Sequence, residues 1–126
     1  RLPVAELRNR AGQFVAPTAA SVAAAAAAGT ASLPEDSDYR VSIVDAPGGA
    51  SYPIASFTWL LLDATPDDTA KARALVRFVR WALREGGGSA SALGYVPLPP
   101  AVAARVDARL AALPFVAGAG VASGAT

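Results

Sequence analysis

Four arginines, Arg73, Arg77, Arg80 and Arg84, recur three or four residues apart along a predicted helix and therefore share one of its faces. Such a row of guanidinium groups could bind an acidic partner or an oxyanion. A row of charges along a helix is more often its solvated face, opposite the buried stripe. Because 11 basic residues are balanced by 10 acidic ones, giving a net charge of +1, we favour the solvated face.

Two glycine-rich segments, residues 45–49 and 85–89, could cradle a phosphate with backbone N–H groups. Neither has the glycine spacing and lysine of a P-loop, and neither matches a dinucleotide fingerprint. The second follows a predicted helix, and the C-terminal end of a helix is the wrong end for an anion. We interpret these segments as a turn and a helix stop. Glycines within residues 118–126 are a similarly weak signal on a predicted tail.

Acidic residues give no stronger indication of catalysis. Glu35, Asp36 and Asp38 lack the calcium-loop pattern and predict a solvated loop rather than a metal site. Asp45, at the end of a predicted strand, is interpreted as a turn former. The chain has no Cys and no His, and no Ser has a visible base partner. We therefore predict that the chain is not an enzyme and uses no cofactor.

Length and composition predict one domain, or a piece of a larger one. Hydrophobic residues make up 53% of the chain, but many are alanines, so the core should be thin. The balanced charge argues against a nucleic-acid partner. No signal peptide and no run of membrane-spanning length are visible. Because Met is absent throughout, we expect a processed or excised piece whose targeting information could lie upstream.

Residues 52–62, YPIASFTWLLL, have no helical period and are rich in aromatic and branched side chains. Such a run predicts a strand in a sheet whose two faces are both covered by helices, so that the strand is buried on both sides. Residues 63–68 follow it as a helix start. Residues 40–44 alternate between apolar and polar, as a half-buried strand does. The fold class predicted from these signals is α/β.

Residues 66–85 predict the clearest helix, with Pro66 in its first turn, Arg84 near its end and glycines at 86–88 as its stop. Its expected apolar stripe comprises Leu75, Val76, Val79, Ala82 and Leu83, broadened by Phe78 and Trp81. A last helix is expected from about residue 100 to residue 113.

Residues 4–17 predict a hairpin in which Gly12 adopts the left-handed conformation that closes a tight reversal. Thr18 is the expected N-cap of an alanine-rich helix at residues 19–28, with Gly29 as its stop. A low-complexity linker is the alternative for this alanine run.

Four segments, taken in order, resemble the C-terminal part of the phosphate-binding proteins that serve phosphate ABC transporters. Residues 9–18, NRAGQFVAPT, are similar to that family's hairpin and the helix start behind it. Residues 52–61, YPIASFTWLL, resemble the strand that returns from the second lobe to the first. Residues 70–81 resemble the following helix, and residues 93–99, LGYVPLP, the turn before the last helix.

The resemblance implies the C-terminal portion of a type II periplasmic-binding-protein-like, two-lobed fold with a mixed sheet flanked by helices. On this basis residues 1–50 would form part of lobe two, residues 51–55 an interlobe crossover and residues 56–113 the C-terminal part of lobe one. Residues 114–126 would be a flexible tail. The family binds phosphate through residues in earlier segments, so no ligand-binding residue is carried over to this chain.

The function that the resemblance implies is capture of inorganic phosphate outside the cytoplasm and its delivery to an ABC transporter permease. The protein would be periplasmic or extracellular, with membrane anchoring through an upstream lipid signal as one option. The chain alone should not bind phosphate, and its exposed strand edges should favour self-association. Alternatives are a binding protein or sensor of the same fold for another oxyanion, a small autonomous interaction domain, and a phosphatase on this scaffold.

Overall fold

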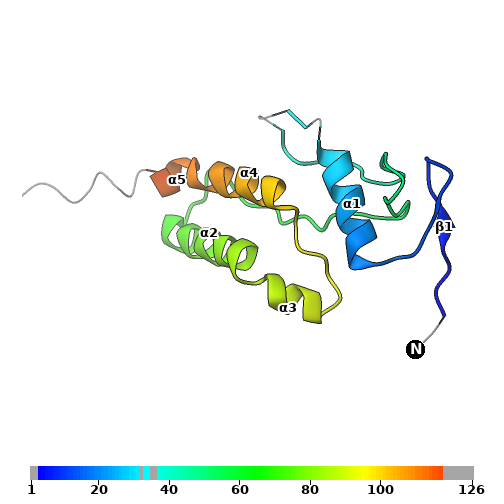
Figure 1. The fold of residues 1–126 in the computed structure, drawn as a ribbon. Coiled ribbons are helices and arrows are strands. Elements are labelled where there is room, and N and C mark those ends of the chain that lie inside the picture. The colour runs from blue at the N-terminus through cyan, green and yellow to red at the C-terminus, as the bar shows by residue number, and fades with distance from the viewer. Residues whose placement is uncertain (1–2, 32, 35–36, 118–126) are drawn as a thin grey trace, which may run out of the picture.

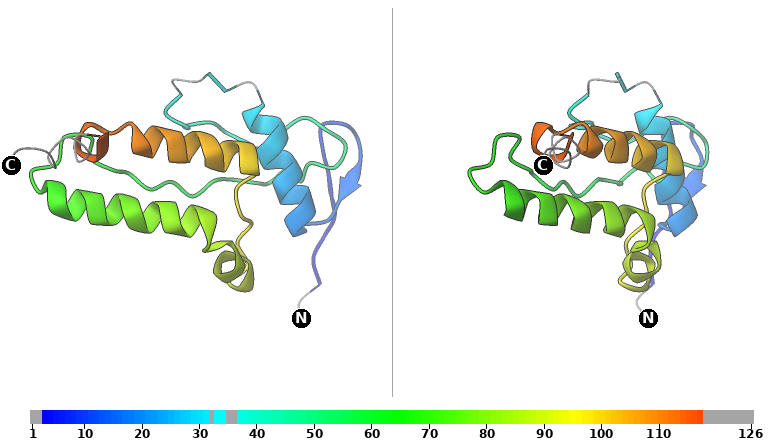
Figure 2. Two further views of the ribbon diagram at one scale, coloured as in Figure 1. Left: turned by 60° about the vertical axis from the view of Figure 1, so that its left-hand side comes forward. Right: turned by 90° about the vertical axis from the view of Figure 1, so that its left-hand side faces the viewer.

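The computed structural model describes residues 3–31, 33–34 and 37–117, and over these ranges the chain is mainly helical (Figure 1). The elements follow in the order β1 (Leu7–Arg8), β2 (Phe14–Val15), α1 (Ala19–Thr30), α2 (Thr69–Arg84), α3 (Gly87–Ala92), α4 (Pro100–Ala111) and α5 (Pro114–Ala117). Helices α2 and α4 lie alongside each other, while α1 and the hairpin form the other end of the molecule (Figure 2). None of the described helices has the length and apolar character needed to cross a bilayer.

The hairpin predicted at residues 4–17 is confirmed. Strands β1 and β2 pair antiparallel, with Leu7 opposite Val15. Gly12 closes the reversal with a φ of 81°, a conformation that residues with a Cβ rarely adopt. The predicted glycine role is therefore confirmed as well.

Asn9, in the hairpin turn, is buried and ties the hairpin to the loop that contains residues 45–51. Its amide nitrogen donates to the carbonyl oxygens of Gly48, Gly49 and Ser51 at 3.2, 2.9 and 3.1 Å. Its side-chain oxygen accepts from the backbone N–H of Gln13 at 3.0 Å. One side chain thus satisfies backbone groups from two segments about 40 residues apart.

Helix α1 begins at the predicted cap. The Thr18 side chain accepts from the Ser21 backbone N–H, and the Ser21 side chain accepts from the Thr18 backbone N–H, which forms a capping box. The predicted stop at Gly29 is wrong, because the helix continues to Thr30. A Cβ at Gly29 would lie 2.6 Å from Cγ2 of Ile43, so glycine serves close packing at this position.

Two small hydrophobic clusters take the place of one continuous core. The first contains Ala25, Ala26, Ile43, Ala46 and Ala55, with Val22, Ala28 and Phe57 packed against it. The second contains Val76, Val79, Leu110 and Phe115, with Leu62, Leu83 and Val106 among its neighbours. Alanine dominates the first cluster, as its abundance in the sequence leads one to expect.

The two longer strands predicted from the sequence are absent from the described part of the chain. Residues 40–44 and 52–62 form no strand there, and the β1–β2 pair is the sole sheet in these ranges. Residues 54–62 are instead an extended segment that runs along α2 and α4 (Figure 2). A strand is defined by its ladder of hydrogen bonds, and none of the described residues forms a partner strand beside this segment.

The helix predicted at residues 66–85 is confirmed with a later start. Asp68 is the N-cap of α2, its side chain accepting from the Lys71 backbone N–H at 2.9 Å. Pro66 therefore precedes the helix and does not lie in its first turn. Val76 and Val79 are buried as expected, whereas Leu75, Phe78 and Trp81 remain about half exposed.

The C-terminal half departs from expectation mainly after its last predicted helix. Helix α4 confirms the prediction for residues 100–113. Residues 114–117 were expected to belong to a tail, but they form α5, and Phe115 is buried in the second cluster. Residues 118–126 lie outside the described residues.

We expect Asn9→Ala to lower the free energy of unfolding by about 2–3 kcal/mol, because it leaves several buried backbone groups without partners. Urea unfolding monitored by circular dichroism measures this change. Arg10→Ala is the matched control: the Arg10 side chain is 63% exposed in its 3.3 Å ion pair with Asp45, and its loss should cost less than about 1 kcal/mol. Equal losses in the two variants would contradict the role given to Asn9.

Candidate functional site

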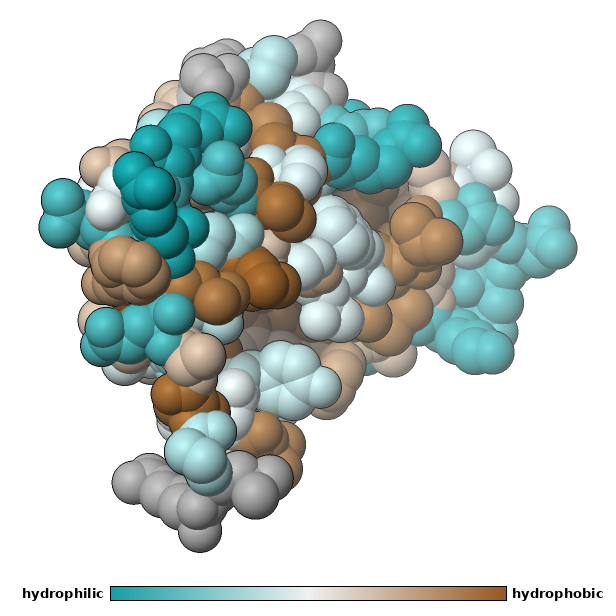
Figure 3. Space-filling view, turned by 90° about the vertical axis from the view of Figure 1, so that its right-hand side faces the viewer, coloured by the Kyte–Doolittle hydropathy of each residue, from teal (hydrophilic) through white to brown (hydrophobic). Residues whose placement is uncertain are grey.

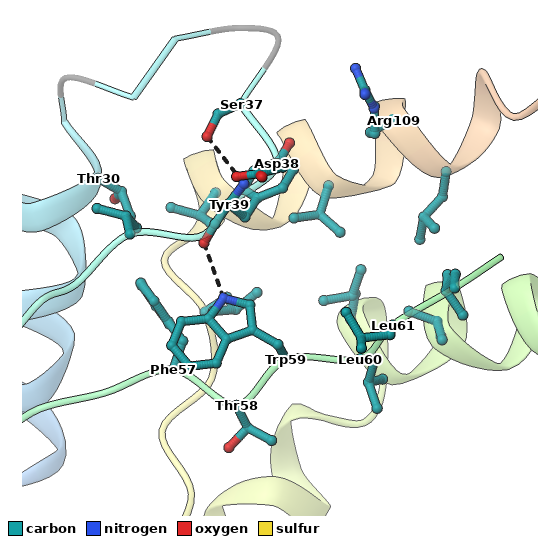
Figure 4. Close-up of a pocket in the computed structure, with 18 of the residues that line it drawn as sticks. Thr30, Ser37, Asp38, Tyr39, Phe57, Thr58, Trp59, Leu60, Leu61 and Arg109 are labelled. Carbon is teal, nitrogen blue, oxygen red and sulfur yellow. Dashed lines mark hydrogen bonds between the residues drawn. The ribbon is translucent and has the colours of Figure 1, made fainter. Parts of the chain in front are cut away.

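An apolar pocket of about 390 Å³ lies beside residues 57–62 (Figure 4). Helix α2 contributes Val79 and Leu83 to its wall, and α4 contributes Val102 and Val106. The pocket exists because residues 57–62 run between helices that have apolar faces. Such a lining favours apolar groups over ions.

Aromatic side chains hold one end of the pocket. The indole nitrogen of Trp59 donates to the backbone carbonyl of Tyr39 at 3.0 Å, and the Phe57 and Trp59 rings meet edge to face with centroids 6.3 Å apart (Figure 4). Tyr39 has a φ of 61°, and its N–H donates to the Ser37 hydroxyl at 3.1 Å. These contacts fix the orientation of Trp59.

Charged groups at the pocket do not converge on its interior. Among the described residues that line it, only Asp38 and Arg109 carry a charge. Asp38 forms an exposed ion pair with Arg40 at 2.6 Å, and Arg109 points away from the indole of Trp59 (Figure 4). The pocket therefore offers no evident means of holding an anion or a metal ion.

Three of the four arginines singled out in the sequence bind groups on α4 and α5. Arg73 donates to the carbonyl oxygen of Phe115 at 2.6 Å. Arg80 binds both carboxylate oxygens of Asp107 at 2.7 and 3.1 Å, and Arg84 binds one of them at 2.8 Å. The prediction of a solvated face opposite the core is therefore wrong for Arg73 and Arg80, which lie along the border between α2 and its neighbours.

Asp107 is the centre of the resulting ion cluster. Hydrogen bonds from Arg80 and then Arg84 stabilise its charged form and lower the pKa of its carboxyl group from 3.8 to about 2. The hydrogen bond to Asp107 also raises the pKa of Arg80. Arg77 is exposed, as predicted for the whole row. The cluster joins α2 to α4 and is occupied internally, so it does not present a free oxyanion site.

The glycine-rich segments serve the fold, as predicted. Asp45 lies in a turn with a φ of 49°, which Asp tolerates better than most residues. The carbonyl oxygens of Gly48 and Gly49 accept from Asn9. Glu85 is the C-cap of α2, its N–H donating to the Trp81 carbonyl, so the predicted helix end is confirmed. Gly87 and Gly88, expected to be part of the stop, begin the short helix α3.

The acidic group predicted as a solvated loop is only partly described. Glu35 and Asp36 lie outside the described residues, and Asp38 pairs with Arg40 as noted above. Within residues 3–31, 33–34 and 37–117, no three acidic, His or Cys side chains lie close enough together to hold a metal ion.

The N-termini of the longer helices are also closed to an external anion. Thr18 and Ser21 occupy the start of α1 through their capping box. Asp68 places a carboxylate at the start of α2, which repels a second anion there. Pro99 and Pro100 begin α4, and Pro100 has no N–H to donate.

Three residues with contacts between distant segments, Asn9, Asp107 and Trp59, are not indicated by their residue types in the sequence. Asn9 is part of the predicted hairpin, but no neighbouring residue in the sequence indicates that its side chain hydrogen-bonds to Gly48 and Ser51. In the sequence Asp107 is one acidic residue of a predicted helix. Its contacts with Arg80 and Arg84 form only because α2 and α4 lie side by side. The sequence predicts an apolar strand around Trp59 and gives no indication that Tyr39 accepts its N–H.

Comparisons with known proteins agree with the resemblance seen in the sequence. The chain is 36% identical over 102 residues to the phosphate-binding protein PstS of Xylella fastidiosa strain 9a5c. It is 40% identical over 112 residues to that of Methanocaldococcus jannaschii, and 34% identical over 109 residues to that of Pasteurella multocida strain Pm70. No protein-family model matches the chain.

These matches cover most of the chain but little of the relatives. They span 81%, 82% and 86% of this chain and 28%, 29% and 31% of the Xylella, Methanocaldococcus and Pasteurella proteins. The chain thus spans less than a third of the relatives' length, and the match falls in their C-terminal part. The expected resemblance to phosphate-binding proteins is confirmed.

We expect Asp107→Asn to lower thermal stability at pH 7 and to have little effect below pH 2. Because the folded state lowers the pKa of Asp107 to about 2, its contribution is complete above the unfolded value of 3.8 and disappears as pH falls through that interval. Thermal melts of both proteins at a series of pH values measure the difference. Glu6→Gln, a change at an exposed carboxylate, is the control and should leave thermal stability at pH 7 unchanged. A pH-independent difference for Asp107→Asn would contradict this account.

Proposed function

We propose that this chain, a homologue of the C-terminal part of the PstS phosphate-binding proteins, forms that part of a solute-binding protein which captures phosphate for an ABC transporter. The supporting observation is the 32–40% identity to PstS relatives over about four-fifths of the chain. Those relatives are named as binding proteins and not as enzymes.

The proposed protein is a two-lobed extracytoplasmic binding protein that hands phosphate to a permease. Residues 1–50 would belong to lobe two, residues 51–55 to the crossover and residues 56–113 to lobe one. The two separate hydrophobic clusters support this division, because one is built around α1 and the other around α2, α4 and α5. Helix α5 extends the part assigned to lobe one beyond residue 113.

We assign the phosphate-binding groups to the part of the protein that this chain does not span. Three observations on the described residues support this assignment. The pocket is apolar, Arg73, Arg80 and Arg84 are bound to internal partners, and the starts of α1 and α2 are occupied by their own caps.

The isolated chain is therefore expected to bind no phosphate. Isothermal titration calorimetry with inorganic phosphate should show no stoichiometric heat, whereas the full-length PstS of Xylella fastidiosa, tested in parallel, should bind. A stoichiometric, saturable phosphate site on the isolated chain would contradict the assignment of the ligand groups to the remainder of the protein.

The isolated chain is also expected to self-associate, because large apolar side chains reach the solvent. Leu60 and Leu61 are 69% and 95% exposed, and hydrophobic surface is visible between hydrophilic regions in Figure 3. Light scattering over a range of concentrations should show dimers or larger species, and Leu61→Lys should reduce them. A monomer at every concentration would contradict this expectation.

A further inference from the structure

The two ends of the molecule, the α1 end and the α2–α4 end, have separate hydrophobic packing. The cluster around α1 and the cluster of α2, α4 and α5 share no buried residue. The chain passes from one to the other through residues 54–62, whose backbone groups form no hydrogen bonds with other backbone groups of the described chain. Such a connection, without a ladder of hydrogen bonds, does not by itself fix the angle between the two ends.

The space between the two ends is not closely packed. The pocket of about 390 Å³ is lined from both sides, by Thr30 and Leu33 at the α1 end and by Val102 and Val106 of α4. Close packing would fix the orientation of the two ends through many small contacts. An open space leaves this role to the individual contacts that bridge it.

Hydrogen bonds from Arg105 and Trp59 bridge this space. Arg105 of α4 donates to the carbonyl oxygen of Leu33 at 3.0 Å and to that of Pro34. The indole nitrogen of Trp59, in the connecting segment, donates to the carbonyl oxygen of Tyr39 at 3.0 Å (Figure 4). All three acceptors are backbone carbonyls of the chain that follows α1. Because hydrogen bonds are directional, these contacts tolerate less sliding than apolar contacts do.

The carbonyl that accepts from Trp59 belongs to a residue with an uncommon backbone conformation. Tyr39 has a φ of 61°, in the left-handed region that bulky residues seldom adopt. Its N–H donates to the Ser37 hydroxyl at 3.1 Å, while its carbonyl accepts from Trp59. Such a conformation persists where the surroundings determine it. The contacts of Tyr39 with Ser37 and Trp59 therefore support a turn that directs its carbonyl towards the connecting segment.

We propose that these two side chains and their three carbonyl acceptors form a latch that holds the two ends of the molecule in one relative orientation. Release of the latch lets the ends turn about residues 58–61, which neither hydrophobic cluster includes. The latch is a property of this chain and goes beyond the proposed function. In the two-lobed protein proposed above, it would join the parts assigned to lobe two and lobe one, and so bias the equilibrium between lobe orientations.

Distances between spin labels on the two ends test the latch. The chain contains no cysteine, so Ala27→Cys on α1 and Ala74→Cys on α2, both at exposed positions, give one labelled pair. Double electron–electron resonance on this pair, with unlabelled chain in excess to dilute contacts between copies, should show one narrow distance distribution. Arg105→Ala and Trp59→Phe should each widen it by about twofold or more, because a second orientation becomes populated.

Two controls separate the latch from a general loss of structure. Arg109 is exposed on the same helix as Arg105 and points away from Trp59 in Figure 4, and Arg109→Ala should leave the distribution unchanged. A second labelled pair, Ala74→Cys with Ala108→Cys, lies within the α2–α4 end, and its distances should stay the same in every variant.

Each outcome bears on the latch without any phosphate present. Widening of the α1–α2 distances alone, in both Arg105→Ala and Trp59→Phe, would support it. An unchanged α1–α2 distribution in either variant would overturn it, as would an equal effect of Arg109→Ala. Widening of the α2–α4 distances would show that these side chains support the fold of that end, and would also overturn the latch. Phosphate binding by the isolated chain would contradict the assignment of the ligand groups and leave the latch intact.

Discussion

The extended segment of residues 54–62 is the constraint on which the described structure depends. It contributes Ala55 and Phe57 to one hydrophobic cluster and Leu62 to the other, so it links two bodies of packing that share no buried residue. Each cluster is small, and the first is built mostly from alanines, which contribute little apolar area each. The path of this one segment therefore decides how the α1 end of the molecule is connected to the α2–α4 end.

Polar interactions reinforce each half in a different way. At the hairpin end, the side-chain amide of Asn9 donates to three backbone carbonyl groups and accepts from one backbone N–H, which holds the hairpin against residues 48–51. At the helical end, Asp107 accepts from Arg80 and Arg84. Arg105 of α4 donates to the carbonyls of Leu33 and Pro34, which follow α1, so this contact joins the two ends of the molecule. The second set uses charged groups at the borders of a thin core, where they remain partly hydrated and are screened by salt.

Local signals in the sequence predicted the local structure well. Thr18, Gly12 and the periodicity of residues 66–85 each depend on interactions within a few residues, and the hairpin, the first cap and α2 follow them. The strand predicted at residues 52–62 is different, because a strand needs a neighbour that the sequence of the segment does not contain. Its apolar pattern predicts a segment buried on both sides, but Trp59, Leu60 and Leu61 are 46%, 69% and 95% exposed in the described chain. Gly29 does not stop the helix, because its role is to let α1 pack closely against Ile43. Local helix propensity does not take such a tertiary contact into account.

The close approach of α1 to Ile43 has a consequence for how these proteins can diverge. Any residue other than glycine at position 29 would bring its Cβ against the isoleucine side chain. Replacement at either position is thus conditional on the other: a larger residue at 29 requires a smaller one at 43, and an isoleucine at 43 keeps glycine at 29. Positions 29 and 43 should therefore change together among homologous sequences, even though glycine in the last turn of α1 offers no advantage to the helix itself.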